Sequence, residues 1–158
     1  MNDTDTRLLR ESLRVAAESR DSGRHPFGAL VTDATGTIVA EAGNDSLPPT
    51  GDPTQHAELR AVALAFRRLG AEGMAGSTLY TSAEPCAMCS GAVYWTGVDR
   101  VVYALSEHRL LELTGDHPEN PTFSLPCREV FARGQRRIEV SGPHLEDEAS
   151  VVHEDFWV

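Results

Sequence analysis

The chain has 158 residues, of which 41% are hydrophobic, and a formal net charge of −10 at pH 7. This length suits a single domain over residues 1–158 and is too short for two full-sized domains, while the apolar content excludes a disordered chain. The acidity argues against a nucleic-acid partner, because proteins that hold phosphate backbones normally carry a basic surface.

The sequence also predicts a protein without a membrane partner. No apolar run approaches the length of a membrane span, and the polar start Met1–Asp5 resembles neither a signal nor a transit peptide. Three cysteines are too few for a disulfide scaffold and fit a reducing, cytoplasmic location.

Hydrophobic periodicity and turn residues predict the secondary structure in chain order. We expect a helix over 4–19, strands over 27–32 and 37–41, a helix from about 54 to 69, a connector over 70–76, a strand over 77–82, a helix over 86–95 and a strand over 101–104. The remainder predicts a short helix over 107–113, a loop over 114–126, a helical turn over 127–131, a strand over 137–140 and a terminal helix over 145–157. This order predicts an α/β fold in which helices cover both faces of a mixed five-stranded sheet.

Two cysteines follow the predicted strand that ends at Ser82. Cys86 and Cys89 are spaced i, i+3, which places both sulfurs on one face of a helix. Pro85 precedes them, and proline is favoured in the first turn of a helix. The positive end of the helix dipole lowers the pKa of thiols there and favours the thiolate, which is the form that binds metal.

His56 and Glu58 lie 30 and 28 residues before Cys86. Residues spaced i, i+2 do not face each other within a helix, so they can converge only on a point beyond the helix start. The residues around Thr54 are typical of a loop and a helix cap, which meets this condition. Two helix starts would then direct one imidazole, two thiolates and one carboxylate at a common point.

This mixture of donors indicates zinc. Zn²⁺ accepts nitrogen and sulfur ligands in a tetrahedral arrangement and keeps an open fourth position where it is catalytic. We therefore expect one Zn²⁺ per chain on His56, Cys86 and Cys89, with Glu58 as a carboxylate that moves protons rather than a ligand. A closed structural site with Cys127 as the fourth ligand is the alternative, but such a site has no use for Glu58.

The His-Ala-Glu stretch at 56–58 followed by Pro-Cys-x-x-Cys at 85–89 resembles the zinc-dependent cytidine/deoxycytidylate deaminase superfamily. The resemblance extends over the middle of the chain, from His25 to Tyr103. Within that superfamily the sequence most resembles those of bacterial guanine deaminases and their purine-deaminase relatives. The matching stretches are 25–29, 52–58, 80–86 and 91–95.

The resemblance implies a three-layer α/β/α cytidine-deaminase-like fold and a hydrolytic aminohydrolase that releases ammonia from an amino-purine or a related heterocycle. Glu58 would take a proton from water, deliver it to a ring nitrogen and later pass a proton to the departing amine. Backbone N–H groups near Ala57 and Cys86 would stabilise the developing charge. A homodimer is expected from the superfamily's usual assembly and from the apolar helix at 91–95.

The resemblance also suggests substrate contacts. Asn44 follows the second strand of the hairpin, where this superfamily places an asparagine against the base or its sugar; the alternative is a turn-closing residue. Phe27 and Trp95 are candidates for the pocket wall or for core or subunit contacts. A C-terminal segment over about 141–158 is a candidate lid, with the contacts Glu154, Asp155, Phe156 and Trp157.

A second acidic residue and the substrate each have more than one candidate. Guanine deaminases use a second acidic residue, for which Asp116 and Glu119 are candidates besides Glu154 and Asp155. The substrate also has alternatives: a tRNA adenosine deaminase or a cytosine or cytidine deaminase would share the motif, and a zinc-stabilised binding module is the alternative outside enzymes.

Overall fold

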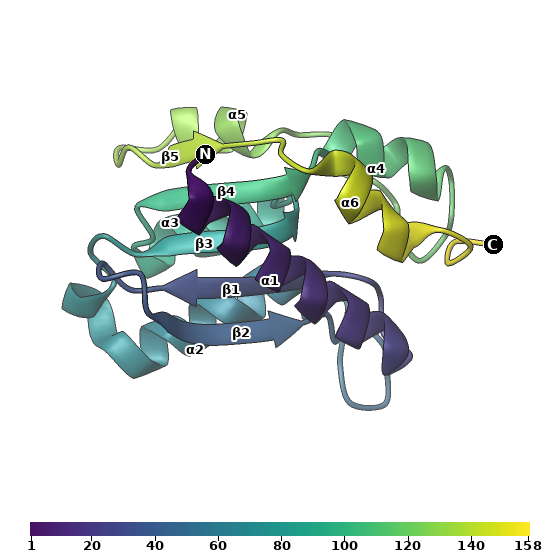
Figure 1. Cartoon of the computed structure of the whole chain (residues 1–158), viewed down its shortest axis with the longest axis horizontal. Coiled ribbons are helices and arrows are strands. Elements are labelled where there is room, and N and C mark those ends of the chain that lie inside the picture. Colours follow the sequence, from purple (N-terminus) through teal and green to yellow (C-terminus); the bar gives the residue numbers. More distant parts are fainter.

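The computed structural model describes all residues from 1 to 158. Its centre is a five-stranded sheet in the order β2-β1-β3-β4-β5 (Figure 1). The strands are β1 (Gly28–Thr32), β2 (Ile38–Gly43), β3 (Thr78–Ala83), β4 (Arg100–Leu105) and β5 (Glu139–Ser141). β1 pairs antiparallel with β2 and β3, while β4 pairs parallel with β3 and β5, so the sheet is mixed as predicted.

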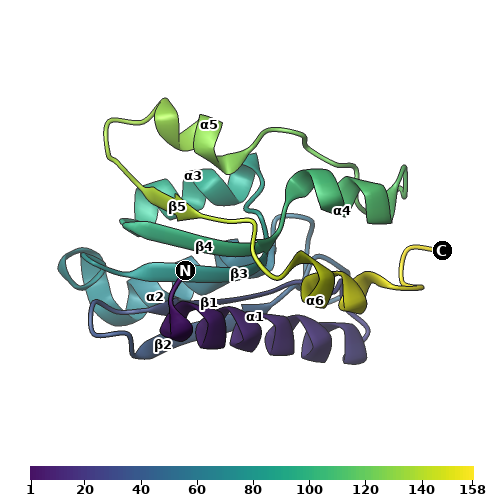
Figure 2. The same cartoon turned by 45° about the horizontal axis from the view of Figure 1, so that its top comes forward.

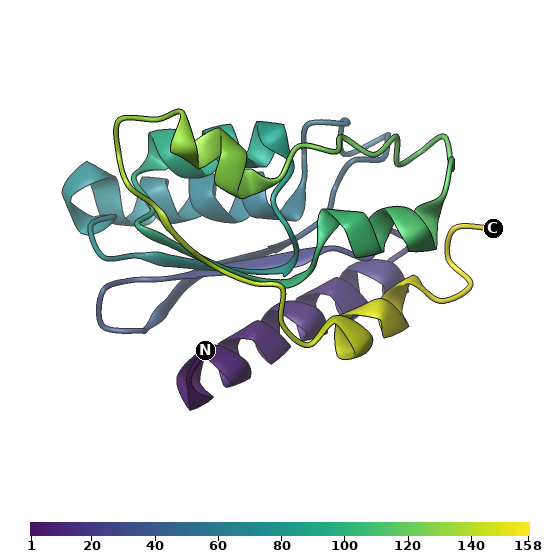
Figure 3. The ribbon, with the colours of Figure 1, turned by 90° about the horizontal axis from the view of Figure 1, so that it is seen from above.

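Helices cover both faces of this sheet. They are α1 (Asp3–Asp21), α2 (Ala57–Gly73), α3 (Ala87–Thr96), α4 (Glu107–Thr114), α5 (Cys127–Ala132) and α6 (Glu146–Ser150), with a 3₁₀ turn at Val151–His153. Seen from above, α2, α3 and α5 lie on one face, and α1 and α6 on the other (Figure 3). The three-layer α/β/α fold is therefore confirmed.

Each layer has its own apolar core. The core under α2, α3 and α5 contains Val62, Val93 and Phe131, and the core under α1 contains Leu8 and Leu9. The buried central strands explain this arrangement, because β1 and β3 are buried along their whole length and present apolar side chains to both layers.

The parallel pair β3–β4 fixes the position of the site. Both strands end at the side of the molecule that carries α4 and the C-terminus (Figure 2). Loops and helix starts that follow the carboxyl ends of adjacent parallel strands lie side by side, and open α/β sheets bind their ligands there.

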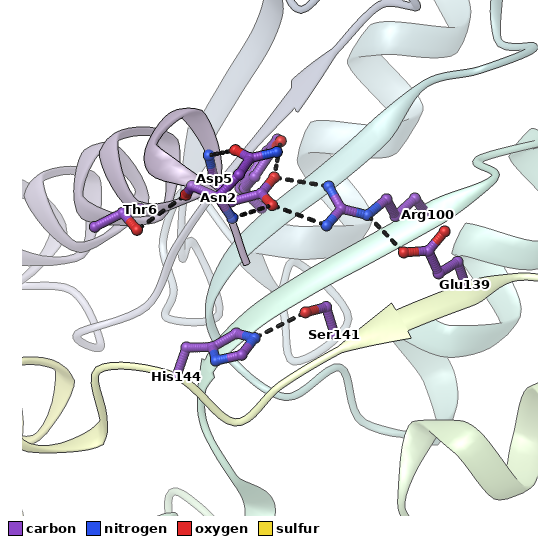
Figure 4. Close-up of polar contacts among 8 residues, drawn as sticks. Asn2, Asp5, Thr6, Arg100, Glu139, Ser141 and His144 are labelled. Carbon is purple, nitrogen blue, oxygen red and sulfur yellow. Dashed lines mark hydrogen bonds and ion pairs between the residues drawn. The ribbon is translucent and has the colours of Figure 1, made fainter.

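The N-terminus of α1 is joined to the sheet by a buried carboxylate (Figure 4). Asn2 caps the helix by accepting a hydrogen bond from the backbone N–H of Asp5 at 2.8 Å. The Asp5 carboxylate in turn accepts two hydrogen bonds from the Arg100 guanidinium of β4, at 2.7 and 3.0 Å, and one from the Tyr80 hydroxyl of β3 at 2.9 Å. Three elements are thus connected through one side chain that is 2% exposed.

Two predicted boundaries are wrong. The second helix begins at Ala57 rather than near Thr54, because Asp52 accepts hydrogen bonds from the backbone and hydroxyl of Thr54 and so closes a turn instead of capping a helix. The helix also passes Leu69: Gly70 adopts a φ of 69°, and a further helical stretch reaches Gly73.

The predicted terminal helix over 145–157 is also wrong in extent. Only Glu146–Ser150 are α-helical, the 3₁₀ turn follows, and residues 154–158 are non-helical. No helix combines the length and the apolar character needed to span a bilayer.

Candidate active site

Two helix starts meet at the carboxyl edge of the sheet. His56 is the N-cap residue of α2 and Cys86 is the N-cap residue of α3, both with extended backbone dihedrals. Neither side chain makes a capping hydrogen bond, so both are free to point away from their helices. Cys89 lies in the first turn of α3 and is fully buried.

One ligand atom from each of His56, Cys86 and Cys89 lies within 4.8 Å of the other two. His56 Nδ1 is 3.6 Å from Cys86 Sγ. A tetrahedral zinc with Zn–S near 2.3 Å and Zn–N near 2.0–2.1 Å holds its sulfur and nitrogen ligands about 3.6 Å apart. The residues therefore fit a zinc ion with these three protein ligands.

The electrostatics of the three side chains favour metal binding. Hydrogen bonds with Cys89 and His56 lower the pKa of Cys86 to about 4 against the effect of burial. The hydrogen bond to Cys86 together with burial raises the pKa of Cys89, and the hydrogen bond with Cys86 also raises the pKa of His56. One thiolate is thus already favoured, and a divalent cation would favour the second.

Glu58 lies directly beside this cluster. Its side chain is 5% exposed, and its Oε2 is 3.8 Å from Cys89 Sγ. Burial raises its pKa to about 7. A carboxyl group with a pKa near neutrality can both take up and release a proton at physiological pH, which suits a general acid and base.

The cluster faces a cavity of about 780 Å³. This volume lies within the roughly 300–1,000 Å³ that is usual for small-molecule sites. Besides His56, Cys86 and Glu58, the wall is formed by His25, Phe27, Asn44, Ser46, Leu47, Pro48, Gly51, Asp52, Pro53, Ala83, Glu84, Met88, Glu107, Leu110, Pro118, Glu119, Asn120, Pro121, Thr122 and Phe123. The wall thus has five carboxylates and no lysine or arginine.

Asn44 and Phe27 both line this cavity. Asn44 is 4% exposed, and its Oδ1 accepts hydrogen bonds from the backbone N–H and the hydroxyl of Ser46, at 2.8 and 2.7 Å. Its Nδ2 makes no hydrogen bond within the chain. Asn44 therefore closes a turn with its oxygen and retains an amide donor for a ligand.

Glu84 organises another part of the cavity wall. Its Oε2 accepts a hydrogen bond from the backbone N–H of Glu107 at 3.1 Å, and its Oε1 accepts one from that of Cys127 at 3.0 Å. The residue before Pro85 thereby fixes the starts of α4 and α5 relative to the metal ligands. The sequence alone did not predict this role of Glu84.

His25 lies in the loop between α1 and β1, but it is not a surface residue. It is 4% exposed and lines the cavity, and its Nε2 is 2.8 Å from Glu119 Oε2. Of the two candidates for a second acid in the loop after α4, only Glu119 lines the cavity, whereas Asp116 is exposed.

The C-terminal residues lie behind the cavity wall rather than on it. Glu154, Asp155, Phe156 and Trp157 are not among the lining residues. The Trp157 ring is 5.2 Å from that of His25 and 6.1 Å from that of Phe27, both of which are lining residues. The segment therefore supports the cavity wall through aromatic contacts.

Three further predicted residues lie away from the cavity. Trp95 is 82% exposed on α3 and is not part of the wall, so the structure does not support a pocket position for it. Ala57 is fully buried at the start of α2, where only its backbone could serve a ligand. Cys127 is buried and outside the group of metal-ligating atoms, which argues against a closed site of four protein ligands.

Comparison with known proteins agrees with this geometry. Residues 2–105 match the family model described as the cytidine and deoxycytidylate deaminase zinc-binding region. A probable cytosine deaminase of Schizosaccharomyces pombe is 41% identical over 157 residues, which cover 99% of this chain and 94% of that relative. A guanine deaminase of Bacillus subtilis is 42% identical over 102 residues, or 64% of each protein.

Solved structures show the same fold. A guanine deaminase from Nitrosomonas europaea superposes with a TM-score of 0.76 at 29% identity, covering 94% of this chain and 81% of the other. Related solved complexes with 8-azaguanine and with 2,6-diaminopurine each give a TM-score of 0.77, at 29% and 28% identity, and cover 94% and 98% of this chain and 82% of each other chain. The chain therefore belongs to the zinc-binding cytidine and deoxycytidylate deaminase family.

Proposed function

We propose that the protein is a zinc-dependent aminohydrolase of a free amino-heterocycle, with guanine or a related purine base as the first candidate. The observation that carries this proposal is the placement of one imidazole and two sulfurs within 4.8 Å of each other, beside buried Glu58 at a cavity wall. A structural zinc site needs neither the carboxyl group nor the cavity.

The roles of the residues follow from their positions. His56, Cys86 and Cys89 would hold Zn²⁺, which when bound supplies Lewis-acid activation of a water molecule. Glu58 takes a proton from that water and delivers it to the ring nitrogen beside the amine-bearing carbon. That carbon gains the oxygen of water and loses ammonia after Glu58 passes a proton to the departing amine. Backbone N–H groups at the starts of α2 and α3 stabilise the developing negative charge.

The charge of the cavity supports a substrate without phosphate. Five carboxylates and no lysine or arginine line it, so a phosphate group would meet repulsion and no cationic partner. A tRNA substrate would need the phosphate contacts that this wall does not offer. The alternative of a tRNA adenosine deaminase is therefore less well supported than a free base, and no nucleic-acid partner is proposed.

The choice between a purine and cytosine rests on two different similarities. The solved complexes with 8-azaguanine and 2,6-diaminopurine, together with the guanine deaminase relatives, support a purine. Cytosine is the second candidate, because the probable cytosine deaminase of Schizosaccharomyces pombe is similar along nearly the whole chain. Asn44 and Phe27 would contact either ring, by an amide hydrogen bond and by stacking.

Ammonia release from zinc-loaded protein tests the proposal. Guanine, 2,6-diaminopurine, adenine, cytosine, cytidine and a tRNA anticodon stem-loop form the panel, with Glu58→Gln protein as the matched control. We expect turnover of at least one free base by the wild-type protein and none of the stem-loop. Turnover of the stem-loop alone, or turnover that persists in the Glu58→Gln protein, would contradict the proposal.

The proposal also includes the location of the protein, its assembly and the role of its C-terminal segment. The protein acts in the cytoplasm as a homodimer, and the exposed Trp95 on α3 contributes to the subunit contact. The segment over 141–158 acts as a lid that moves from its position behind the His25 side of the wall over the cavity, and this movement would bring Glu154, Asp155, Phe156 and Trp157 to the base.

A further inference from the structure

One carboxyl group in the cavity has neither a role in the reaction proposed above nor a side-chain partner within the chain. Glu107 is the first residue of α4, directly after β4 and its N-cap Ser106, and its side chain lines the same cavity as Glu58 and Cys86. It makes no side-chain hydrogen bond and no ion pair within the chain. Three other carboxylates of the wall, in contrast, already have protein partners: Asp52 accepts from Thr54, Glu84 accepts from two backbone N–H groups, and Glu119 binds His25.

The backbone at Glu107 is firmly fixed. Its N–H donates to Glu84 Oε2, and the preceding Ser106 donates from both its backbone and its hydroxyl to Glu146 Oε1, at 3.0 and 2.7 Å. The Ser106 hydroxyl also caps the helix by accepting a hydrogen bond from the backbone N–H of Arg109 at 3.1 Å. A side chain on such an anchored helix start is held at a defined place in the cavity, which is what a recognition residue requires.

Covering the carboxyl group of Glu107 with a ligand costs free energy, because of its surroundings. Burial, followed by the negative charges of Cys86, Glu58 and Glu84, raises its pKa to about 7. Water can solvate the carboxyl group while the cavity is open. A ring that enters the cavity displaces this water, and the carboxyl group then loses hydrogen bonds unless the ring offers a donor in exchange.

We propose that Glu107 is a specificity-determining residue that accepts a hydrogen bond from a ring N–H or amino group of the substrate other than the amine that is removed. The inference rests on the proposed function for the identity of the ring class, but it concerns recognition rather than proton transfer. It predicts that the protein prefers heterocycles with a second donor. An acceptor that the bound ring shields from water rejects analogues that lack the matching donor far more strongly than an apolar wall does.

The test separates binding from turnover. Titration calorimetry on zinc-loaded Glu58→Ala protein measures the affinity for guanine, cytosine, 2,6-diaminopurine and 2-aminopyrimidine, of which the last has one amino group and no ring N–H and therefore lacks a second donor. The same titrations are made with Glu107→Leu and with Glu107→Gln added to Glu58→Ala. Glu112→Leu is the matched control, because Glu112 lies on the same helix with its side chain paired to Arg109 in solvent.

We expect Glu107→Leu to weaken the binding of the best ligand by about 10- to 100-fold, as for the loss of a hydrogen bond to a charged group. Glu107→Gln should weaken it less, since one acceptor oxygen remains. The preference for ligands with a second donor should also disappear in Glu107→Leu, which a merely structural role would not cause. Glu112→Leu should change neither quantity.

Unchanged affinities together with an unchanged order of preference in both Glu107 variants would overturn the inference. If Glu107→Leu loses zinc or fails to fold, Glu107→Gln decides by the order of preference alone. Wild-type protein that deaminates a base while the Glu107 variants bind normally would refute the inference and leave the proposed function intact. Binding that depends on Glu107 without any turnover in the wild-type protein would support the inference and refute the proposed function. Absence of both binding and turnover would refute both.

Discussion

Glu58 combines burial with a titratable group, and the function proposed above gives this position the proton transfer. The side chain is 5% exposed and touches Cys89, so its size and shape matter for packing as well as for chemistry. A glutamine has nearly the same volume and keeps the packing, but it cannot carry a proton between water and the ring. Substitution at this residue therefore separates the two contributions.

We predict that Glu58→Gln retains zinc and stability but loses at least about 10²–10⁴-fold in kcat, the usual contribution of general acid–base catalysis. Metal content by elemental analysis, thermal unfolding and ammonia release form the measurement. Wild-type turnover in this variant would show that another group moves the proton.

Cys127 allows a second test at the level of a single residue. It is buried, and its sulfur does not belong to the group formed by His56, Cys86 and Cys89. Burial also raises the pKa of its thiol. A thiol that stays protonated is a poor ligand. We predict that Cys127→Ser keeps both sulfurs in the zinc shell, as measured by X-ray absorption, and keeps one zinc per chain. A shell with one sulfur fewer would support a closed structural site.

The sequence predicted the metal ligands because their spacing is itself chemical information. The pattern is short and specific to few kinds of metal site, and it contains His56, Cys86 and Cys89. Glu107 and His25 were missed, since each is a common residue type whose importance comes from tertiary placement. Glu107 does carry a weak signal: it lies two residues after the end of an apolar strand, and polar residues near that position of a parallel sheet lie at the ligand-binding edge.

At the level of the elements, the first helix depends on one buried ion pair. Asp5 bonds with Arg100 and Tyr80, and the hydrogen bond with the Arg100 guanidinium holds the pKa of this carboxyl group well below its usual range. A carboxyl group with a depressed pKa in the folded state adds stability above its unfolded pKa of about 4, and this stability is lost as the pH falls further.

We predict that Asp5→Asn lowers the free energy of unfolding at pH 7 by about 2–3 kcal/mol, because Arg100 loses its charged partner. The difference between variant and wild type should shrink below about pH 4, where the wild-type carboxylate is also being protonated. Urea unfolding at several pH values measures both effects. Asp3→Asn, in the same helical turn but exposed, is the control and should cost little.

The C-terminal turn contains a second titratable group with the opposite proton balance. His153 is 3% exposed, and its Nδ1 accepts a hydrogen bond from Trp157 Nε1 at 3.1 Å. Burial and the nearby Arg20 lower its pKa to about 4. Between pH 4 and about 6.5 the unfolded chain therefore binds a proton that the folded chain does not, so stability rises with pH over this interval and then levels off.

We predict that His153→Gln removes up to roughly 3 kcal/mol of this pH dependence between pH 6.5 and 4. His108→Gln, at a highly exposed position on α4, is the control and should leave the slope unchanged. Equal slopes for wild type and His153→Gln in urea unfolding would contradict the burial of a neutral imidazole.

The element boundaries show where local patterns mislead. The order of helices and strands was predicted because periodicity persists over whole elements. The start of α2 was not, since Asp52 and Thr54 have the composition of a helix cap and form a turn. The terminal helix was predicted too long for a different reason: tertiary contacts of Phe156 and Trp157 with Arg20 and His25 hold the last residues in a non-helical path.

At the level of the whole molecule, the strongly negative net charge and one exposed aromatic side chain determine which surfaces can contact other molecules. Trp95 is 82% exposed and lies edge-on to Tyr94 at 5.3 Å, on a helix whose other end carries the metal ligands. A large aromatic side chain in water is costly, and such residues are enriched at the centres of subunit contacts.

We predict that Trp95→Glu converts a dimer to a monomer, or weakens dimerisation at least about tenfold, while zinc content stays at one per chain. Light scattering across a range of protein concentrations measures the assembly. Leu111→Glu, a partly exposed apolar position on α4, is the control. A wild-type protein that is monomeric at all concentrations would exclude this contact.

The two hydrogen bonds of Glu84 have a consequence for how the protein could be altered. Its carboxylate holds the amide of Glu107 with one oxygen and that of Cys127 with the other, so both ends of the intervening stretch are fastened at a single point next to the metal ligands. That stretch supplies seven of the 23 residues that line the cavity and none of the metal ligands. A foreign segment grafted between these two anchors would offer a different ring a new surface while the chemistry beneath stays as it is, which makes residues 108–126 the natural unit of exchange for redesign.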